Sequence, residues 1–188
     1  MTATPARSIA PAAYDAVSRS LHWGMATLIV IAFVLGLTVD LFPKSWDHAL
    51  VEIHKIIGTA ILLLLLVRLG WRLTHRAPAP EEGSAILSFA ARAGHIALYI
   101  VMFIVPILGI LYAVRRGQGL DFGLFALPPL QAAEPRSITR PIRTWHELAA
   151  YALIAFACLH AIAACWHHFI RQDGVLRRML PASHRKAL

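Results

Sequence analysis

The stretch from Trp145 to His168, WHELAAYALIAFACLHAIAACWHH, is apolar and long enough to form a membrane-spanning helix. It carries His146 near its start and His160 fourteen residues later. A helix rises about 1.5 Å and turns about 100° per residue, so the two imidazoles lie about 21 Å apart along the axis and on the same face. Two aligned histidines near opposite ends of one span suggest two ligand sites at different depths of a bilayer.

The face shared by these histidines is lined mostly by small side chains, at Ala150, Leu153, Ala157 and Ala164. Small residues let a flat group lie close to the helix backbone. The chain holds ten histidines, and an ionisable side chain at membrane depth is costly and usually functional. The alternative for any single histidine is a neutral ring that is hydrogen-bonded to a neighbouring helix or lies among the lipid headgroups.

The bulk composition is that of a membrane protein of one domain. Of the 188 residues, 58% are hydrophobic and only 15% are charged, and the mean hydropathy is +0.62. The net charge of +8 and the pI near 10.3 would suggest nucleic-acid binding in a soluble protein. Here the basic residues lie between apolar segments, so membrane topology explains them better and no nucleic-acid partner is expected.

Four apolar segments predict an all-α membrane protein built as an antiparallel four-helix transmembrane bundle. The spans are expected at about 16–42, 48–73, 86–114 and 145–170, within a single transmembrane domain covering 14–181, with polar tails at 1–13 and 182–188. Pro43 ends the first span and Pro106 is expected to kink the third. The segment 115–143 is expected to be a long loop with no regular structure beyond a short helix.

Four spans place both termini and the connection between the second and third spans on one side of the membrane. That side carries eleven Lys and Arg residues, and the other side carries seven. Because cytoplasmic loops are enriched in Lys and Arg, the distribution predicts that both termini are cytoplasmic.

The alternating topology brings histidines together in pairs. The start of the first span lies level with the end of the fourth, which pairs His22 with His160. The start of the second lies level with the start of the fourth, which pairs His54 with His146. Two neutral imidazoles that approach from opposite helices form the axial arrangement of a six-coordinate b-type haem. A structural zinc site would require four ligands at one depth and is the weaker interpretation.

His95 begins the third span on the same side as His22. It could replace His22 or His160 as a ligand, or it could hydrogen-bond a haem propionate or a quinone. The second role is favoured.

Several ordered motifs resemble those of bacterial cytochrome b561, a family of four-helix dihaem membrane proteins. They are Ser-Leu-His-Trp at 20–23, Ile-His-Lys-Ile-Ile-Gly at 53–58, Gly-His-Ile-Ala-Leu-Tyr at 94–99, Trp-His-Glu at 145–147, Leu-His-Ala at 159–161, His-His at 167–168 and Leu-Arg-Arg-Met-Leu-Pro at 176–181. The resemblance extends over residues 14–181. It implies a bacterial inner-membrane protein with two b haems, one toward each membrane face, whose iron ligands would be His22, His160, His54 and His146.

The same resemblance implies an activity, a superoxide:ubiquinone oxidoreductase (superoxide oxidase). Superoxide would lose its electron at the periplasmic side, and ubiquinone in the membrane would accept electrons. Similar proteins serve as membrane anchors of hydrogenases and dehydrogenases, so a non-catalytic electron-transfer subunit with a soluble redox partner is the alternative. A histidine-relay transporter is a third possibility.

Cations gather on the predicted periplasmic side, against the direction of the topology rule, at Arg115, Arg116, Arg136, Arg140 and Arg143, with Lys55 beside His54. Such a cluster would concentrate a small anion such as superoxide at the outer haem. Arg115, Arg143 and Lys55 are therefore the candidate catalytic residues, as cations that steer the substrate. The alternative is a solvated loop that contacts phosphate headgroups. Trp145, His95 and the basic residues near the inner haem are candidates for the quinone site.

Overall fold

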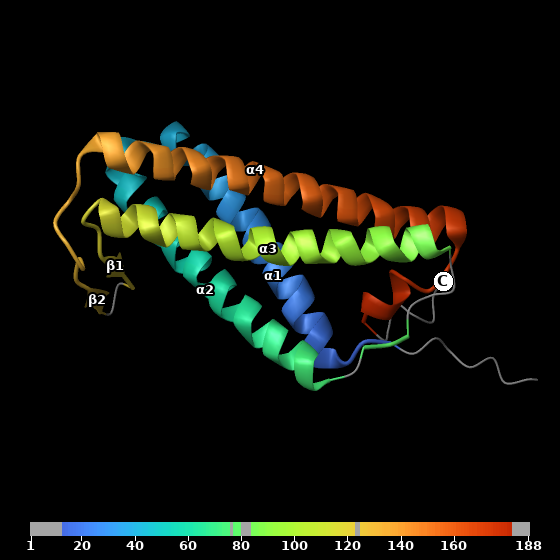
Figure 1. Ribbon diagram of the computed structural model, residues 1–188. Helices are drawn as coiled ribbons and strands as arrows, with labels where there is room; N and C mark the ends of the chain where they lie inside the picture. Colours follow the sequence, from blue (N-terminus) through green and yellow to red (C-terminus); the bar gives the residue numbers. More distant parts are fainter. Residues whose placement is uncertain (1–12, 76, 80–83, 123–124, 182–188) are drawn as a thin grey trace, which may run out of the picture.

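Four long helices make up the computed structural model, which describes residues 13–75, 77–79, 84–122 and 125–181. Each helix is long and apolar enough to cross a membrane. Consecutive helices run in opposite directions (Figure 1), and contacts join α1 to α2, α2 to α3 and α3 to α4. The expected all-α membrane fold is confirmed, with helices α1 (Ala16–Thr38), α2 (Asp47–Thr74), α3 (Ala85–Arg115) and α4 (Arg136–Trp166).

The bundle has two distinct ends (Figure 1). The terminal end holds the start of α1, the end of α2, the start of α3 and the short helices η3 (His167–Arg171) and η4 (Arg177–Met179). The hairpin end holds η1 (Val39–Leu41), η2 (Lys44–Trp46), the start of α4 and a two-stranded antiparallel hairpin, β1 (Leu120–Asp121) and β2 (Ala126–Leu127).

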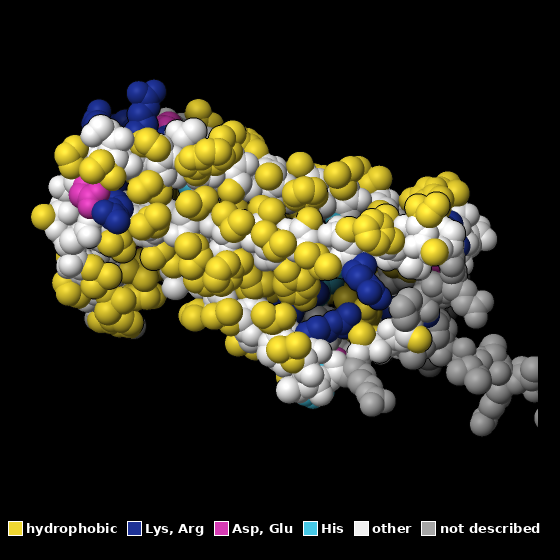
Figure 2. Space-filling view, in the orientation of Figure 1, with side chains coloured by type: hydrophobic (Ala, Val, Ile, Leu, Met, Phe, Trp, Pro, Cys, Tyr) yellow, Lys and Arg dark blue, Asp and Glu magenta, His cyan; other side chains and the backbone are white. Residues whose placement is uncertain are grey.

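Apolar side chains cover the outside of the bundle rather than filling a large core. Few side chains are buried, among them Met25, Ile61, Leu65 and Leu153, whereas Leu63 and Leu159 are 58% and 62% exposed. Hydrophobic side chains cover most of the face in Figure 2. An apolar exterior on four helices of membrane-spanning length suits a lipid surrounding, and the protein is a multi-pass membrane protein.

The start of α1 is fixed by Asp15. Its carboxylate accepts hydrogen bonds from the backbone N–H and the hydroxyl of Ser18, at 2.9 and 2.6 Å, and from the indole N–H of Trp71 at 3.2 Å. The first bonds satisfy a helix N-terminus that has no partners of its own. The bond from Trp71 also ties α1 to the end of α2.

The turn after α3 depends on Gly117, which has a φ of +63°. Its N–H donates to the Val114 carbonyl, and the Gln118 N–H donates to the Ala113 carbonyl, both at 2.9 Å. This is the pattern of a helix that ends on a left-handed residue. A Cβ at this position would lie 2.7 Å from the Ala133 nitrogen, so the turn also lets the chain return closely to the start of α4.

The expectation of a loop over 115–143 is wrong for its second half. Helix α4 begins at Arg136, and the strands β1 and β2 of the hairpin also lie within this range. The helix has 31 residues and is therefore about 46 Å long, against about 30 Å of hydrocarbon. Its first turns extend beyond the apolar stretch, so their polar composition resembles that of a loop. Pro141 lies only six residues into α4, where it removes a single hydrogen bond near the helix start.

The segment that follows η3 packs against the bundle at the start of α1. The Trp23 indole donates to the Met179 carbonyl at 2.8 Å, and the Tyr14 N–H donates to the Arg178 carbonyl at 3.2 Å. The closing Leu-Arg-Arg-Met-Leu motif therefore covers the start of α1.

We expect Asp15→Ala to reduce stability by about 1 kcal/mol, because it leaves the first N–H groups of α1 without an acceptor. The hydrogen bonds from Ser18 hold the pKa of Asp15 at about 2, below its usual value of 3.8. Its stabilising contribution is thus present above about pH 4 and is lost as the pH falls towards 2. Thermal unfolding in detergent at several pH values measures both effects. Asp15→Asn, which keeps a capping side chain, is the control and should retain most of the stability at pH 7.

Candidate functional site

Two pairs of histidine rings face each other inside the bundle, one near each end. His54 of α2 and His146 of α4 have ring centroids 6.0 Å apart, with ring planes at 83°. His22 of α1 and His160 of α4 have centroids 6.2 Å apart, with planes at 78°. The structure thus brings together both pairs expected from the alternating topology. The two pairs have almost the same centroid distance and almost the same angle between the ring planes.

The two rings at the hairpin end are oriented by backbone carbonyls. Nδ1 of His54 donates to the Ala32 carbonyl of α1, and Nδ1 of His146 donates to the Val105 carbonyl of α3, both at 2.9 Å. A carbonyl oxygen only accepts, so the proton of each neutral ring is on Nδ1. Each Nε2 therefore keeps the lone pair that a metal ligand needs.

A glycine lies beside each of these two rings. A Cβ at Gly36 would lie 3.3 Å from Cε1 of His54, and a Cβ at Gly109 would lie 3.1 Å from Cε1 of His146. Gly36 follows Ala32 by four residues, and Gly109 follows Val105 by four. In a helix the carbonyl of residue i bonds to the N–H of residue i+4. The glycine thus leaves space for an imidazole to reach a carbonyl that is already used within the helix.

The spacing of both pairs fits one metal ion between the two rings. Metal–imidazole bonds are about 2.0–2.1 Å long, and each ring centre lies about 1 Å beyond its nitrogen, which sets the centres about 6 Å apart. The four rings therefore fit two bis-histidine irons, as b-type haems require. No group of three or more His, Cys, Asp or Glu side chains within the described segments is arranged to hold a metal ion by itself, which does not favour zinc.

His95 of α3 joins the pair at the terminal end. Its ring centroid lies 5.3 Å from that of His160, with the planes at 66°. This separation is shorter than those of the two matched pairs. His95 is therefore better described as a neighbour of the proposed ligands than as a replacement for His22. Its role in binding a propionate or a quinone remains a prediction.

Each of the three cations predicted to steer an anion has a carboxylate partner. Lys55 pairs with Glu52 at 2.5 Å and also donates to the Gly119 carbonyl at 2.7 Å. Arg115 pairs with Glu134 at 2.5 Å, and Arg143 pairs with Glu147 at 2.7 Å. These partners cancel much of the field of each cation at a distance. Sequence reasoning missed them, although the spacing of Glu52 from Lys55 and of Glu147 from Arg143 suits helical pairs.

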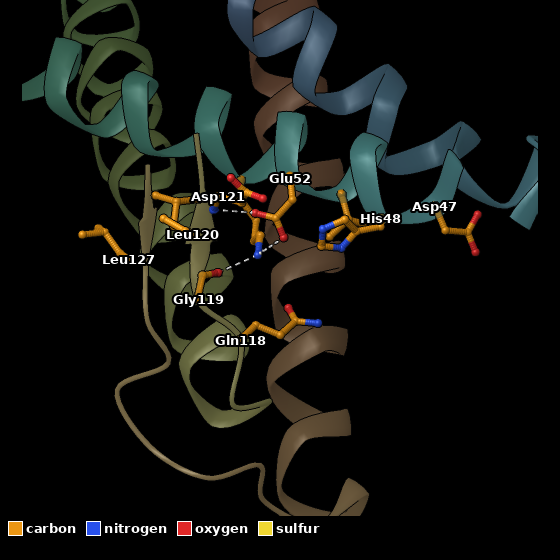
Figure 3. A pocket seen from close by; sticks show the side chains of 11 residues that line it. Asp47, His48, Glu52, Gln118, Gly119, Leu120, Asp121 and Leu127 are labelled. Atoms are coloured by element: carbon orange, nitrogen blue, oxygen red, sulfur yellow. Dashed lines mark hydrogen bonds and ion pairs between the residues drawn. The ribbon is translucent and has the colours of Figure 1, made fainter. Parts of the chain in front are cut away.

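The Glu52–Lys55 pair lies in a pocket of about 360 Å³ between α2 and the hairpin. Figure 3 shows Glu52 facing the strand that carries Asp121, and the Asp121 N–H donates to its carboxylate at 3.0 Å. Lys55 is thus held under the hairpin, directly after His54 in the sequence, with its side chain only 13% exposed. It is poorly placed to meet an anion from solution.

Nδ1 of His167, whose role could not be predicted, forms a hydrogen bond with the Asp173 carboxylate at 2.5 Å. Burial is the largest single influence and raises the pKa of Asp173, but the hydrogen bonds from His167 and the Val175 N–H and the nearby charges of His167 and Arg171 together lower it below its ordinary value. Arg171 approaches the same carboxylate at 3.5 Å. The contact links η3 to the segment that covers the start of α1.

Comparison with known proteins identifies the family. The family model for prokaryotic cytochrome b561 matches residues 13–182. The chain is 33% identical over 179 residues to "Cytochrome b561 homolog 2" of Escherichia coli K12, covering 92% of this chain and 94% of that one. It is 29% identical over 171 residues to "Probable superoxide oxidase CybB" of Yersinia pestis, covering 89% and 96%. It is also 29% identical over 176 residues to "Cytochrome b562" of Cereibacter sphaeroides, covering 89% and 94%.

The match extends from the first turn before α1 to the end of the described segment, and it includes all four paired histidines. Four membrane-spanning helices with two pairs of facing imidazoles fit a membrane electron carrier with b-type haem. The chain belongs to the prokaryotic cytochrome b561 family, whose members hold two b haems.

Proposed function

We propose that His22 with His160, and His54 with His146, each hold the iron of one haem b. The observation that supports this most strongly is the repeated geometry, with two ring pairs at 6.0 and 6.2 Å and nearly perpendicular planes. His146 and His160 lie on one helix, about 21 Å apart along its axis. Together the two sites form an electron path between the membrane faces.

The chain contributes ligation, orientation and a low-dielectric surrounding to this path. Bound haem supplies one-electron exchange between ferric and ferrous iron. The carbonyls of Ala32 and Val105 hold His54 and His146 in the tautomer that presents Nε2. Four apolar helices keep water away from the electron path between the two sites.

We further propose that the protein is a superoxide:ubiquinone oxidoreductase. The support is its 29% identity with a relative named a probable superoxide oxidase, over nearly the full length of both chains. In the overall reaction two superoxide anions each lose one electron and become dioxygen. One ubiquinone gains these two electrons and two protons and becomes ubiquinol.

The proposed orientation in the bacterial inner membrane puts the terminal end in the cytoplasm. That end carries eleven of the eighteen Lys and Arg residues, and the hairpin end carries seven. Superoxide would then react at the periplasmic hairpin end, near His54 and His146, and both termini would be cytoplasmic.

Any steering of superoxide must come from cations that have no carboxylate partner. The hairpin end has seven Lys and Arg residues against six Asp and Glu residues, so its net charge is small. Within the described segments, no carboxylate pairs with Arg116, Arg136 or Arg140. We propose that Arg136 and Arg140, on the first turns of α4 close to His146, attract the anion more than Arg115, Arg143 and Lys55 do.

The direct test uses the purified protein loaded with haem and supplied with superoxide and ubiquinone, without any other protein. Haem reduction followed by formation of ubiquinol is the expected result. If superoxide reduces neither haem, the chain is better explained as an electron-transfer subunit of a dehydrogenase or hydrogenase. If protein produced with sufficient haem shows no b-type absorbance bands, the histidine-relay transporter is the better explanation.

Gly109→Ala is expected to reduce the haem content at the hairpin-end site, because the new Cβ would push the His146 ring away from the Val105 carbonyl. His146→Ala serves as the reference and should halve the haem-to-protein ratio. The ratio in Gly109→Ala should lie between those of His146→Ala and the wild type. The control is Gly70→Ala, since a Cβ at Gly70 has no neighbour within 4 Å. Haem content by the pyridine haemochrome method measures the effect. Wild-type content in Gly109→Ala would contradict the role given to this glycine.

The variant Arg136→Gln/Arg140→Gln should slow superoxide-driven haem reduction and weaken its dependence on salt, because it removes two unpaired charges near the electron entry point. Arg143→Gln/Glu147→Gln removes an ion pair without changing the net charge and should leave the rate nearly unchanged. Arg171→Gln/Arg177→Gln makes the same charge change at the other end and is the matched control. Stopped-flow absorbance at several ionic strengths gives the rates. Equal slowing in all three variants would exclude local steering.

A further inference from the structure

Arg68 is a cation at membrane depth that has no carboxylate partner within the described segments. It lies six residues before the end of α2 and is partly buried. Its Nε donates to the Tyr99 hydroxyl of α3 at 3.1 Å. A neutral phenol orients the guanidinium but does not balance its charge. An arginine inside a membrane protein usually meets an anion or a water-filled cavity.

The position of Arg68 makes this imbalance costly. The 28-residue helix α2 is about 42 Å long, against about 30 Å of hydrocarbon. Arg68 lies about 9 Å from its end, close to the inner edge of the hydrocarbon. Arg72 follows one turn later on the same face of α2. Its guanidinium lies over the Tyr14 ring at 5.2 Å, and no described carboxylate pairs with it.

The two arginines lie near the three histidines of the terminal end. Arg68 is within electrostatic reach of His22, His95 and His160, and Arg72 is within reach of His95. His95 and Tyr99 are four residues apart on α3, so the phenol that orients Arg68 lies on the face of the helix that carries His95. Figure 2 shows Lys and Arg side chains gathered at this end between α2 and α3.

We propose that Arg68, oriented by Tyr99, and Arg72 bind a carboxylate of the cofactor held by His22 and His160, that is, a propionate of the haem at the terminal end. This inference rests on the proposed ligand pair. Arginine presents a planar set of donors that matches a carboxylate. With Nε used by Tyr99, both terminal nitrogens of Arg68 remain for the anion. The propionate supplies the missing negative charge, and the arginines keep it ionised beside the iron.

A lipid phosphate is the other anion that two arginines at this depth could bind. The bond from Arg68 to Tyr99 favours the haem, because it holds the guanidinium against the face of α3 that carries His95. The two sources predict different effects. A propionate ligand is part of the cofactor, so its effect on the iron persists without phospholipid.

The test is a redox titration of the haem-loaded full-length protein, followed by its visible absorbance, in detergent free of phospholipid. Arg68→Gln should lower the midpoint potential of one haem and leave the other unchanged, because the unbalanced propionate charge stabilises ferric iron. Arg68→Lys, which keeps the charge, should restore most of the potential. Tyr99→Phe should produce a smaller shift in the same direction. Arg171→Gln removes a charge at the same end that is already paired with Asp173, and it should shift neither potential.

Unchanged potentials in Arg68→Gln with both haems present would overturn the proposal. A shift that appears only after reconstitution into vesicles of phosphatidylglycerol would also overturn it, because the anion would then be a lipid phosphate. An increase in the KM for ubiquinone with unchanged potentials would assign the arginines to the quinone instead.

His160→Ala tests the underlying ligand pair separately: it should remove one haem, whereas Arg68→Gln should retain two after purification. If His160→Ala also retains two haems, the ligand assignment fails rather than the propionate site.

Discussion

The arrangement of this protein depends on keeping imidazole rings neutral, oriented and opposed inside a low-dielectric bundle. A histidine in such a place must hydrogen-bond one nitrogen and leave the other for a ligand. At the hairpin end this is achieved with helix backbone: His54 and His146 each donate to a carbonyl of a neighbouring helix. A glycine four residues after each carbonyl provides the space. The same local arrangement occurs on α1 and on α3, so the rings of His54 and His146 are held in equivalent ways.

The two ends of the bundle differ in how their cationic side chains are paired with carboxylates. At the hairpin end most cations have carboxylate partners, and the Glu52–Lys55 pair is enclosed under the hairpin. At the terminal end Arg68 and Arg72 have no such partner in the described part of the chain. The histidines of the terminal end therefore lie near two cations that no described carboxylate balances. The haem propionate proposed for this end would supply the negative charge that these cations lack.

Much of the fold follows from the sequence, because four apolar stretches of membrane length admit few arrangements. The alternation of direction also explains why His22 meets His160 and why His54 meets His146. What could not be predicted depends on contacts between distant residues. The pairing of Arg115 with Glu134, across the hairpin connection, has no local signal. Nothing in the sequence distinguishes Gly36 and Gly109 from other glycines of membrane helices, because the histidine ring beside each comes from another helix. The start of α4 was missed because its first turns extend beyond the apolar span and have a polar composition.

If each ring pair coordinates one haem iron, electron paramagnetic resonance of the oxidised protein will detect both sites directly. The ring planes cross at 78° and 83°. We therefore expect two low-spin ferric signals of the strongly anisotropic type that nearly perpendicular axial imidazoles produce. The loss of one signal in His22→Ala and of the other in His54→Ala would assign them. A single haem signal, a high-spin signal or the rhombic signal of parallel imidazoles would contradict the account.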